Sequence, residues 1–240
     1  MEKKSNINSK IRKLEESLEF IKKKIIYHEN SHLLFSYLFG FTVKYVDYTI
    51  ISNISLKSSS IEMVFDSNAH AYIDIPIFLS EYFNHLRYVG TSDSFMKKIN
   101  VPKDIIDNMT VAYITGLLAG YEAERHFFNR LKYWRIKRFI KKFSQDYTLK
   151  NIMEDETKVE EILKSLNFNK NEITEIRKVT LYKIRLALKN KSLTHLFHLF
   201  FELSQKNTRL SQEQIESLLA ENNFEKTSQS ILENINSKCK

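Results

Sequence analysis

Cysteine, proline and glycine are all scarce in this chain of 240 residues, which has one Cys, two Pro and four Gly. The single Cys239 has no partner for an internal disulfide, so we expect a reducing compartment, the cytoplasm. Few prolines and glycines beside many Lys, Glu, Leu and Ile residues favour helices joined by short polar connections.

Long apolar runs and nucleotide-binding loops are missing as well. No stretch reaches the roughly 18 consecutive apolar residues of a membrane-spanning helix, and residues 1–17 are too charged for a signal peptide. The sequence has no GxxxxGKS/T phosphate loop, and therefore no sign of its own ATPase. Hydrophobic residues still make up 42% of the chain, enough for a substantial core in one compact domain or two small ones.

The hydrophobic pattern is mostly helical, with one interruption. Residues 41–51, 60–65 and 71–75 alternate apolar and polar side chains and are rich in β-branched and aromatic residues. They predict three short antiparallel strands. Helical periodicity returns at residues 75–89 and, after Pro102, continues almost to the C-terminus. We therefore expect a mainly α fold of the α+β class, with a small antiparallel sheet and a helical C-terminal region.

The most informative motif is HENSH at residues 28–32, which matches HExxH. Two histidines four residues apart lie on one face of a helix, so both imidazoles can bind one zinc ion while Glu29 points at the bound water. Apolar residues on both sides predict a buried helix from about Glu16 to Phe39, ended by Gly40. The alternative is that His28 and His32 are hydrogen-bonded core histidines.

A catalytic zinc ion needs a third protein ligand. The segment GYEAER at residues 120–125 carries Glu122 and Glu124 on an apolar helix, where a carboxylate is costly to bury without a cation or a hydrogen-bond donor. Glu124 is therefore a zinc ligand, an acceptor for a histidine N–H, or the partner of Arg125 or a lysine. The two glycines of GLLAG, residues 116–120, predict a close approach of another backbone.

Two segments, YHENSHLLFSYLFGFTVKYV and LLAGYEAERHFF, resemble the proteolytic domain of the FtsH family of ATP-dependent zinc metalloproteases. That domain has an HEAGH helix, a short strand region, a GRxAEE-type helix and then an aspartate in a turn. Residues 184–219 are similar to its closing helices, so the resemblance covers roughly residues 20–222. The membrane anchor and the ATPase module of the family have no counterpart in this sequence.

The resemblance implies a zincin-like core at residues 1–150 and a helical part at residues 151–240, packed together as one protease domain. It also implies that Asp146 is the third zinc ligand and that Glu124 supports the site from behind the ligands. Asp155 and Glu154 are the fallback ligands, and Glu124 itself would bind zinc if the site resembled that of the glutamate-zincins.

The expected function is that of a zinc metalloendopeptidase acting on unfolded polypeptides or peptides. His28, His32 and Asp146 would hold Zn²⁺, and Glu29 would take a proton from the bound water. A homo-oligomer or a separate ATPase is the expected partner. The alternative is a catalytically weak or inactive protease-fold protein that binds and regulates a partner.

The net charge of +8 is concentrated in RLKYWRIKRFIKK at residues 130–142. Helical spacing predicts that one face of this segment is buried and that the other is exposed. The predicted buried residues are Leu131, Trp134, Phe139 and Phe143. The predicted exposed residues are Lys132, Arg135, Arg138 and Lys142. The exposed face is either simply solvated, or it contacts an anionic lipid surface, RNA or an acidic protein. The sequence has no base-reading motif, so we expect no specific nucleic-acid partner.

Overall fold

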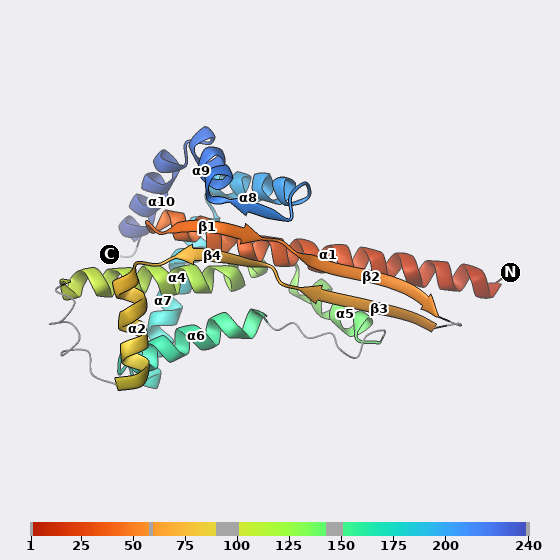
Figure 1. Cartoon of the computed structure of the whole chain (residues 1–240), viewed down its shortest axis with the longest axis horizontal. Helices are drawn as coiled ribbons and strands as arrows, with labels where there is room; N and C mark the ends of the chain where they lie inside the picture. The colour runs from red at the N-terminus through yellow and green to blue at the C-terminus, as the bar shows by residue number, and fades with distance from the viewer. Residues whose placement is uncertain (1, 58–59, 90–100, 143–150, 239–240) are drawn as a thin grey trace.

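The computed structural model describes residues 2–57, 60–89, 101–142 and 151–238. Its longest element is the helix α1 (Glu2–Leu38), whose 37 residues run along the length of the molecule (Figure 1). The predicted helix around HENSH is confirmed, and it begins about four turns earlier than predicted. Gly40 follows it with a φ of 83°, the left-handed conformation that favours glycine after a helix.

The strand region differs from the prediction of three strands, which is wrong. It forms β1 (Thr42–Asp47), β2 (Ile50–Lys57), β3 (Ser60–Ser67) and β4 (His70–Asp74). The segment 41–51 breaks because the Asp47 carboxylate accepts a hydrogen bond from the Thr49 N–H at 2.7 Å, which turns the chain after β1. Residues 52–57, expected as a connection, continue β2 instead.

These strands make two antiparallel sheets. In the first sheet, β1 lies between β4 and the short strand β5 (Arg209–Ser211), and the second sheet is the hairpin of β2 and β3. Among the described residues, β4 is therefore an outer strand with one open edge.

Helices follow the strands and make up most of the described chain, which confirms the mainly α class. They are α2 (Ile77–Val89), α4 (Lys103–Phe127), α5 (Arg130–Ile140), α6 (Asn151–Ser165), α7 (Lys170–Leu188), α8 (Lys191–Ser204), α9 (Gln212–Glu221) and α10 (Phe224–Lys238). No helix in the described ranges is both long enough and apolar enough to cross a lipid bilayer.

The core is divided along α1. Its C-terminal half packs with α4 and the C-terminal helices in the largest apolar cluster, which extends from Ile26 to Ile235 and so joins both sides of position 150. Its N-terminal half packs with α5 and the β2–β3 hairpin in a second cluster around Leu14 and Ile21. HENSH lies in the half of α1 that belongs to the largest cluster.

The helix α5 is rotated relative to the prediction from its sequence. Leu131 and Trp134 were expected to be buried, but their side chains are 70% and 53% exposed, so this expectation is wrong. Tyr133, Ile136 and Ile140 pack on α1 instead. Both sets have helical spacing, and the second set is favoured because it continues into the fully buried Ile140. Of the other predicted residues, Phe139 does pack inward, the four basic residues are exposed, and Phe143 lies outside the described residues.

Candidate metal centre

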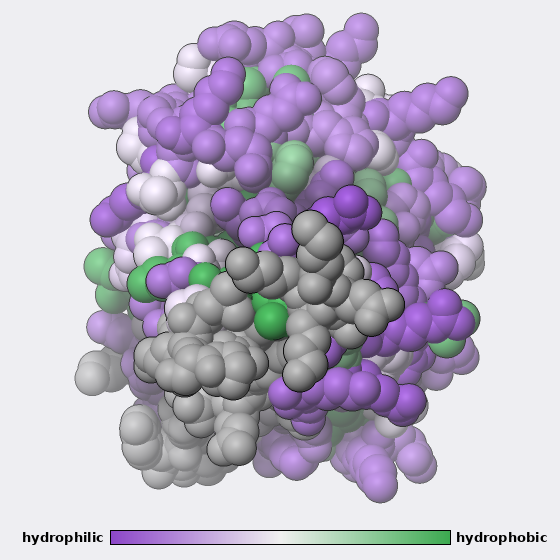
Figure 2. All heavy atoms as spheres, turned by 90° about the vertical axis from the view of Figure 1, so that its right-hand side faces the viewer, coloured by the Kyte–Doolittle hydropathy of each residue, from purple (hydrophilic) through white to green (hydrophobic). Residues whose placement is uncertain are grey.

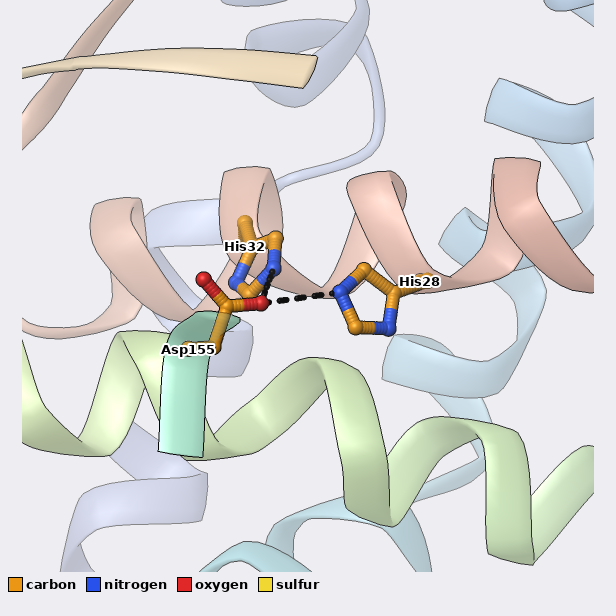
Figure 3. Close-up of side chains that lie close together, drawn as sticks. All are labelled: His28, His32 and Asp155. Carbon is orange, nitrogen blue, oxygen red and sulfur yellow. Dashed lines mark hydrogen bonds and ion pairs between the residues drawn. The ribbon is translucent and has the colours of Figure 1, made fainter. Parts of the chain in front are cut away.

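The two histidines of HENSH lie one turn apart on α1 and point to the same side of the helix. Their ring centroids are 4.6 Å apart, and both side chains are buried. Asp155 of α6 reaches them from the other side, as Figure 3 shows, with its Oδ2 atom 3.1 Å from His28 Nε2 and 3.2 Å from His32 Nε2. The three side chains thus present two imidazole nitrogens and one carboxylate to a common point.

The other nitrogen of each ring has a separate acceptor. His28 Nδ1 donates a hydrogen bond to Glu124 Oε1 at 3.1 Å, and His32 Nδ1 donates one to the carbonyl oxygen of Gly116 at 2.9 Å. Because a carbonyl oxygen only accepts hydrogen bonds, the Nδ1 atom of His32 carries a proton. When this imidazole is neutral, its Nε2 atom therefore has a free lone pair. A metal ion binds to an imidazole nitrogen through such a lone pair.

This arrangement fits a tetrahedral metal ion. Zinc–nitrogen and zinc–oxygen distances of about 2.0–2.1 Å place neighbouring ligands of a tetrahedron about 3.3 Å apart. The distances of 3.1 and 3.2 Å from Asp155 to the two Nε2 atoms are close to that value. All three ligand atoms lie within 4.8 Å of one another. Two imidazoles and one carboxylate form a donor set typical of catalytic zinc.

Electrostatics also favours a positive charge at this point. Burial by itself lowers the pKa of His28, but hydrogen bonds to Asp155 and Glu124 outweigh burial and raise this pKa to about 10. Burial raises the pKa of Asp155, and the hydrogen bonds to both histidines outweigh that effect and lower it well below its usual range. When no metal ion is bound, a proton on His28 therefore balances the negative charge of Asp155. A bound metal cation would balance the same charge in place of the proton.

Behind His28 lies a buried carboxylate with its own cation. Glu124 contacts Lys24 through one oxygen and His28 through the other, so two of the predicted alternatives for this residue, histidine acceptor and lysine partner, are both found. Burial raises the pKa of Glu124, while His28 and Lys24 lower it more, so the carboxylate is ionised. Glu124 faces the Nδ1 side of His28, away from the point where the three ligand atoms meet.

Lys24 was not predicted. It lies one turn before His28 on the same face of α1, and its burial lowers its pKa more strongly than Glu124 raises it. The signal available in the sequence was a lysine at the i−4 position of the motif on an otherwise buried face. Glu122 is the other glutamate of GYEAER. Arg185 of α7 donates two hydrogen bonds to its carboxylate, from Nε at 2.7 Å and from Nη2 at 2.9 Å.

The GLLAG segment predicted a close approach of another backbone, but the nearest groups to its two glycines are side chains of α1. A Cβ atom at Gly120 would lie 2.5 Å from Cε1 of His28 and 2.7 Å from its Nε2. At Gly116 the nearest atom to such a Cβ would be Ser36 Oγ at 3.7 Å, an ordinary contact. Gly120 therefore leaves the space that the His28 ring occupies.

Glu29 directly follows His28 and is buried, with only 4% of its surface exposed. Its Oε2 atom accepts a hydrogen bond from the Ala71 N–H of β4 at 2.8 Å. Burial raises the pKa of Glu29, and the nearby His32 and His28 oppose this without cancelling it. A carboxylate with a raised pKa is better suited to accept a proton near neutral pH.

The remaining predicted ligands are placed differently. Asp146, the expected third ligand, lies outside the described residues. Glu154 falls in α6, but its side chain lies outside the described part. Asp155, named as a fallback, is the carboxylate that the fold brings to His28 and His32. No sequence spacing marks it, because α5 and the following segment separate α6 from α4.

Comparisons with protein-family models, with curated proteins and with solved structures give no match to this chain.

Proposed function

We propose that this chain is a zinc-dependent metallopeptidase in which His28, His32 and Asp155 hold the metal ion and Glu29 is the general base. The observation that carries the proposal is the convergence of two Nε2 atoms and one carboxylate oxygen, with both Nδ1 atoms held by other acceptors. Three protein ligands leave the further coordination position that distinguishes a catalytic zinc site from a structural one.

Zinc held by these residues would lower the pKa of a water molecule and polarise a peptide carbonyl. Glu29 would be the proton acceptor for this water, through its Oε1 atom, because Oε2 already accepts a hydrogen bond from the Ala71 N–H. Glu124 fixes the ring of His28, and Gly116 fixes the ring of His32.

The open edge of β4 gives an extended substrate a place to bind. Ala71 pairs with Val46 of β1, yet its N–H bonds to Glu29, so this N–H points away from β1. Backbone groups alternate in direction along a strand, so the N–H and C=O of Ile73 point to the same open edge. A peptide added as a strand along this edge would pass next to Glu29.

The order of elements supports the FtsH-like interpretation. HENSH on α1, GYEAER on α4 and an aspartate from a later segment follow one another as the resemblance requires, with Asp155 in the position proposed earlier for Asp146. A catalytic unit of this kind would act on unfolded polypeptides or peptides, with a homo-oligomer or an ATPase as its partner. We place this activity in the cytoplasm because the chain has a single cysteine.

The Glu29→Gln variant tests the mechanism. It keeps the ligands and removes the base, so we expect one bound zinc ion per chain, as in the wild type, and a loss of casein cleavage of about 10²- to 10⁴-fold. Glu19→Gln, the same change at an exposed position of α1, is the control and should cleave normally. Full activity of Glu29→Gln would refute the proposed role of Glu29.

A second candidate function is that of a zinc-binding regulatory protein. The hydrogen bond from the Ala71 N–H favours this function, because it occupies one carboxylate oxygen of Glu29 and holds Glu29 at the edge of β4. Such a protein would bind one zinc ion and cleave neither casein nor a peptide library. It would act through contact with a protease, an ATPase or another copy of itself.

A further inference from the structure

The outer face of α5 exposes a leucine and a tryptophan among basic side chains. Leu131, Trp134, Arg135, Arg138 and Lys142 recur every three or four residues and so share one face, here called the α5 patch. The opposite face of α5 already packs on α1 and the β2–β3 hairpin. The exposure of Leu131 and Trp134 is therefore not the result of a helix that has nothing to pack against.

All charged residues within the segment 130–142 are basic. Residues 130–142 contain seven Lys and Arg residues and no Asp or Glu. Within the part of the chain that the structure describes, none of the seven pairs with a carboxylate, whereas Lys132 and Lys137 lie over the rings of Phe20 and Trp134. A hollow of about 540 Å³ lies over the helix and is lined by its residues and the two lysines that follow. The patch thus combines an apolar centre with a basic rim.

The apolar centre of the α5 patch is small, because it consists of the side chains of Leu131 and Trp134. Figure 2 views the molecule from the end where α1 begins, and outside the grey atoms it shows a mainly hydrophilic surface with scattered hydrophobic side chains. Stable protein interfaces have a continuous apolar core. Two apolar side chains inside a basic rim match a lipid headgroup region better, where tryptophan is enriched and basic residues meet phosphates.

We propose that the α5 patch docks the protein on an anionic phospholipid surface. Leu131 and Trp134 enter the boundary between headgroups and acyl chains, and Arg135, Arg138 and Lys142 contact lipid phosphates. Single-stranded RNA is the less favoured occupant, because non-specific binding of a strand uses several aromatic rings in a row, and this face has one. On the inner face of α5, the ring of Tyr133 lies 4.4 Å from Nζ of Lys24, measured to the ring centroid. Because Lys24 is one helical turn from His28, docking would hold the candidate metal centre close to the membrane. The inference does not depend on the metal centre being catalytic.

The chain contains its own reporter for this contact, because Trp134 is its single tryptophan. We expect the protein to sediment with vesicles of phosphatidylcholine mixed with phosphatidylglycerol and not with vesicles of phosphatidylcholine alone. The emission of Trp134 should shift to shorter wavelength on binding and should be quenched by brominated acyl chains. Added salt should weaken the binding.

Two variants separate the patch from net charge. Arg135→Glu combined with Arg138→Glu should weaken binding more than about tenfold. Lys206→Glu combined with Lys226→Glu changes net charge equally at exposed positions on the C-terminal side and should bind almost as the wild type does. Circular dichroism checks that both variants are folded. An equal loss in both variants, an unchanged Trp134 spectrum, or tighter binding of polyuridylate than of anionic vesicles at the same salt would overturn the proposal.

Discussion

At the scale of single residues, the two histidines of HENSH are oriented before any metal ion binds. Each ring donates one hydrogen bond from Nδ1, to Glu124 in one case and to Gly116 in the other. A ring held in this way loses little freedom on binding a metal ion, although His28 must also release the proton on its Nε2 atom. The third residue of the proposed ligand set, Asp155, comes from a separate element, so its role needs its own test.

Asp155→Asn tests that third ligand. The amide keeps the shape of the side chain but removes the negative charge, so we expect zinc affinity to fall by at least about a hundredfold. The measurement is competition for zinc with a chromophoric chelator. Asp146→Asn is the matched comparison and should bind zinc like the wild type. The reverse result, with affinity lost only in the Asp146 variant, would return the third ligand to Asp146.

The sequence was sufficient for one part of this site and not for the other. The spacing of His28, Glu29 and His32 is local, because three and four residues along a helix always share a face. Asp155 lies 127 residues after His28, and the two residues meet because α6 packs on α4, which in turn packs on α1. The resemblance to the FtsH family implied Asp146 as the third ligand and left Asp155 as a fallback, because a resemblance of short motifs does not determine which later residue the fold brings to the histidines.

At the scale of elements, the crossing of α1 and α4 sets the geometry of the site. Gly120→Ala would place a Cβ atom 2.5 Å from the ring of His28, so the ring or the helix must move. We expect a loss of about 1–3 kcal/mol in the free energy of unfolding, measured with a chemical denaturant, together with weaker zinc binding.

Gly116→Ala is the control for that variant, since it makes the same substitution one turn earlier on the same face. Its Cβ atom meets only Ser36 Oγ, at 3.7 Å, and alanine favours a helix over glycine by up to about 1 kcal/mol. We expect this variant to be as stable as the wild type or more stable. If both variants were destabilised equally, helix packing in general, and not the His28 ring, would explain the effect.

The elements themselves were predictable to different degrees. Helical periodicity located α1, α2 and α4 because apolar residues at spacings of three and four mark one buried face. The same rule misjudged α5, where two apolar stripes compete and only the contact with α1 decides between them. The strands were miscounted because β2 is rich in Ser and Asn and depends on pairing with β3, which no local pattern reveals.

At the scale of the whole molecule, α1 connects the α5 patch, the β2–β3 hairpin and the candidate metal centre. Its first half carries α5 and the hairpin, and its second half carries the two histidines inside the largest apolar cluster. Asp155 belongs to the C-terminal part of the chain, so the candidate metal centre is made from both parts. A metal ion there would link α6 to α1 directly, in addition to the packing of both helices on α4.

This link predicts that zinc stabilises the folded protein as a whole. The ligands meet only in the folded chain, so free zinc at about 100 times its dissociation constant should add about 2.7 kcal/mol to the free energy of unfolding. For a chain of this size that corresponds to a rise of roughly 5–10 °C in the melting temperature. Calorimetry of the protein treated with a chelator, before and after zinc is restored, measures the change.

Asp155→Asn should show little rise in the melting temperature under the same conditions, because the remaining two histidines hold zinc weakly. If the wild type and this variant responded equally, zinc would be acting elsewhere on the protein. If neither responded, the point where His28, His32 and Asp155 meet would hold a proton and no metal ion.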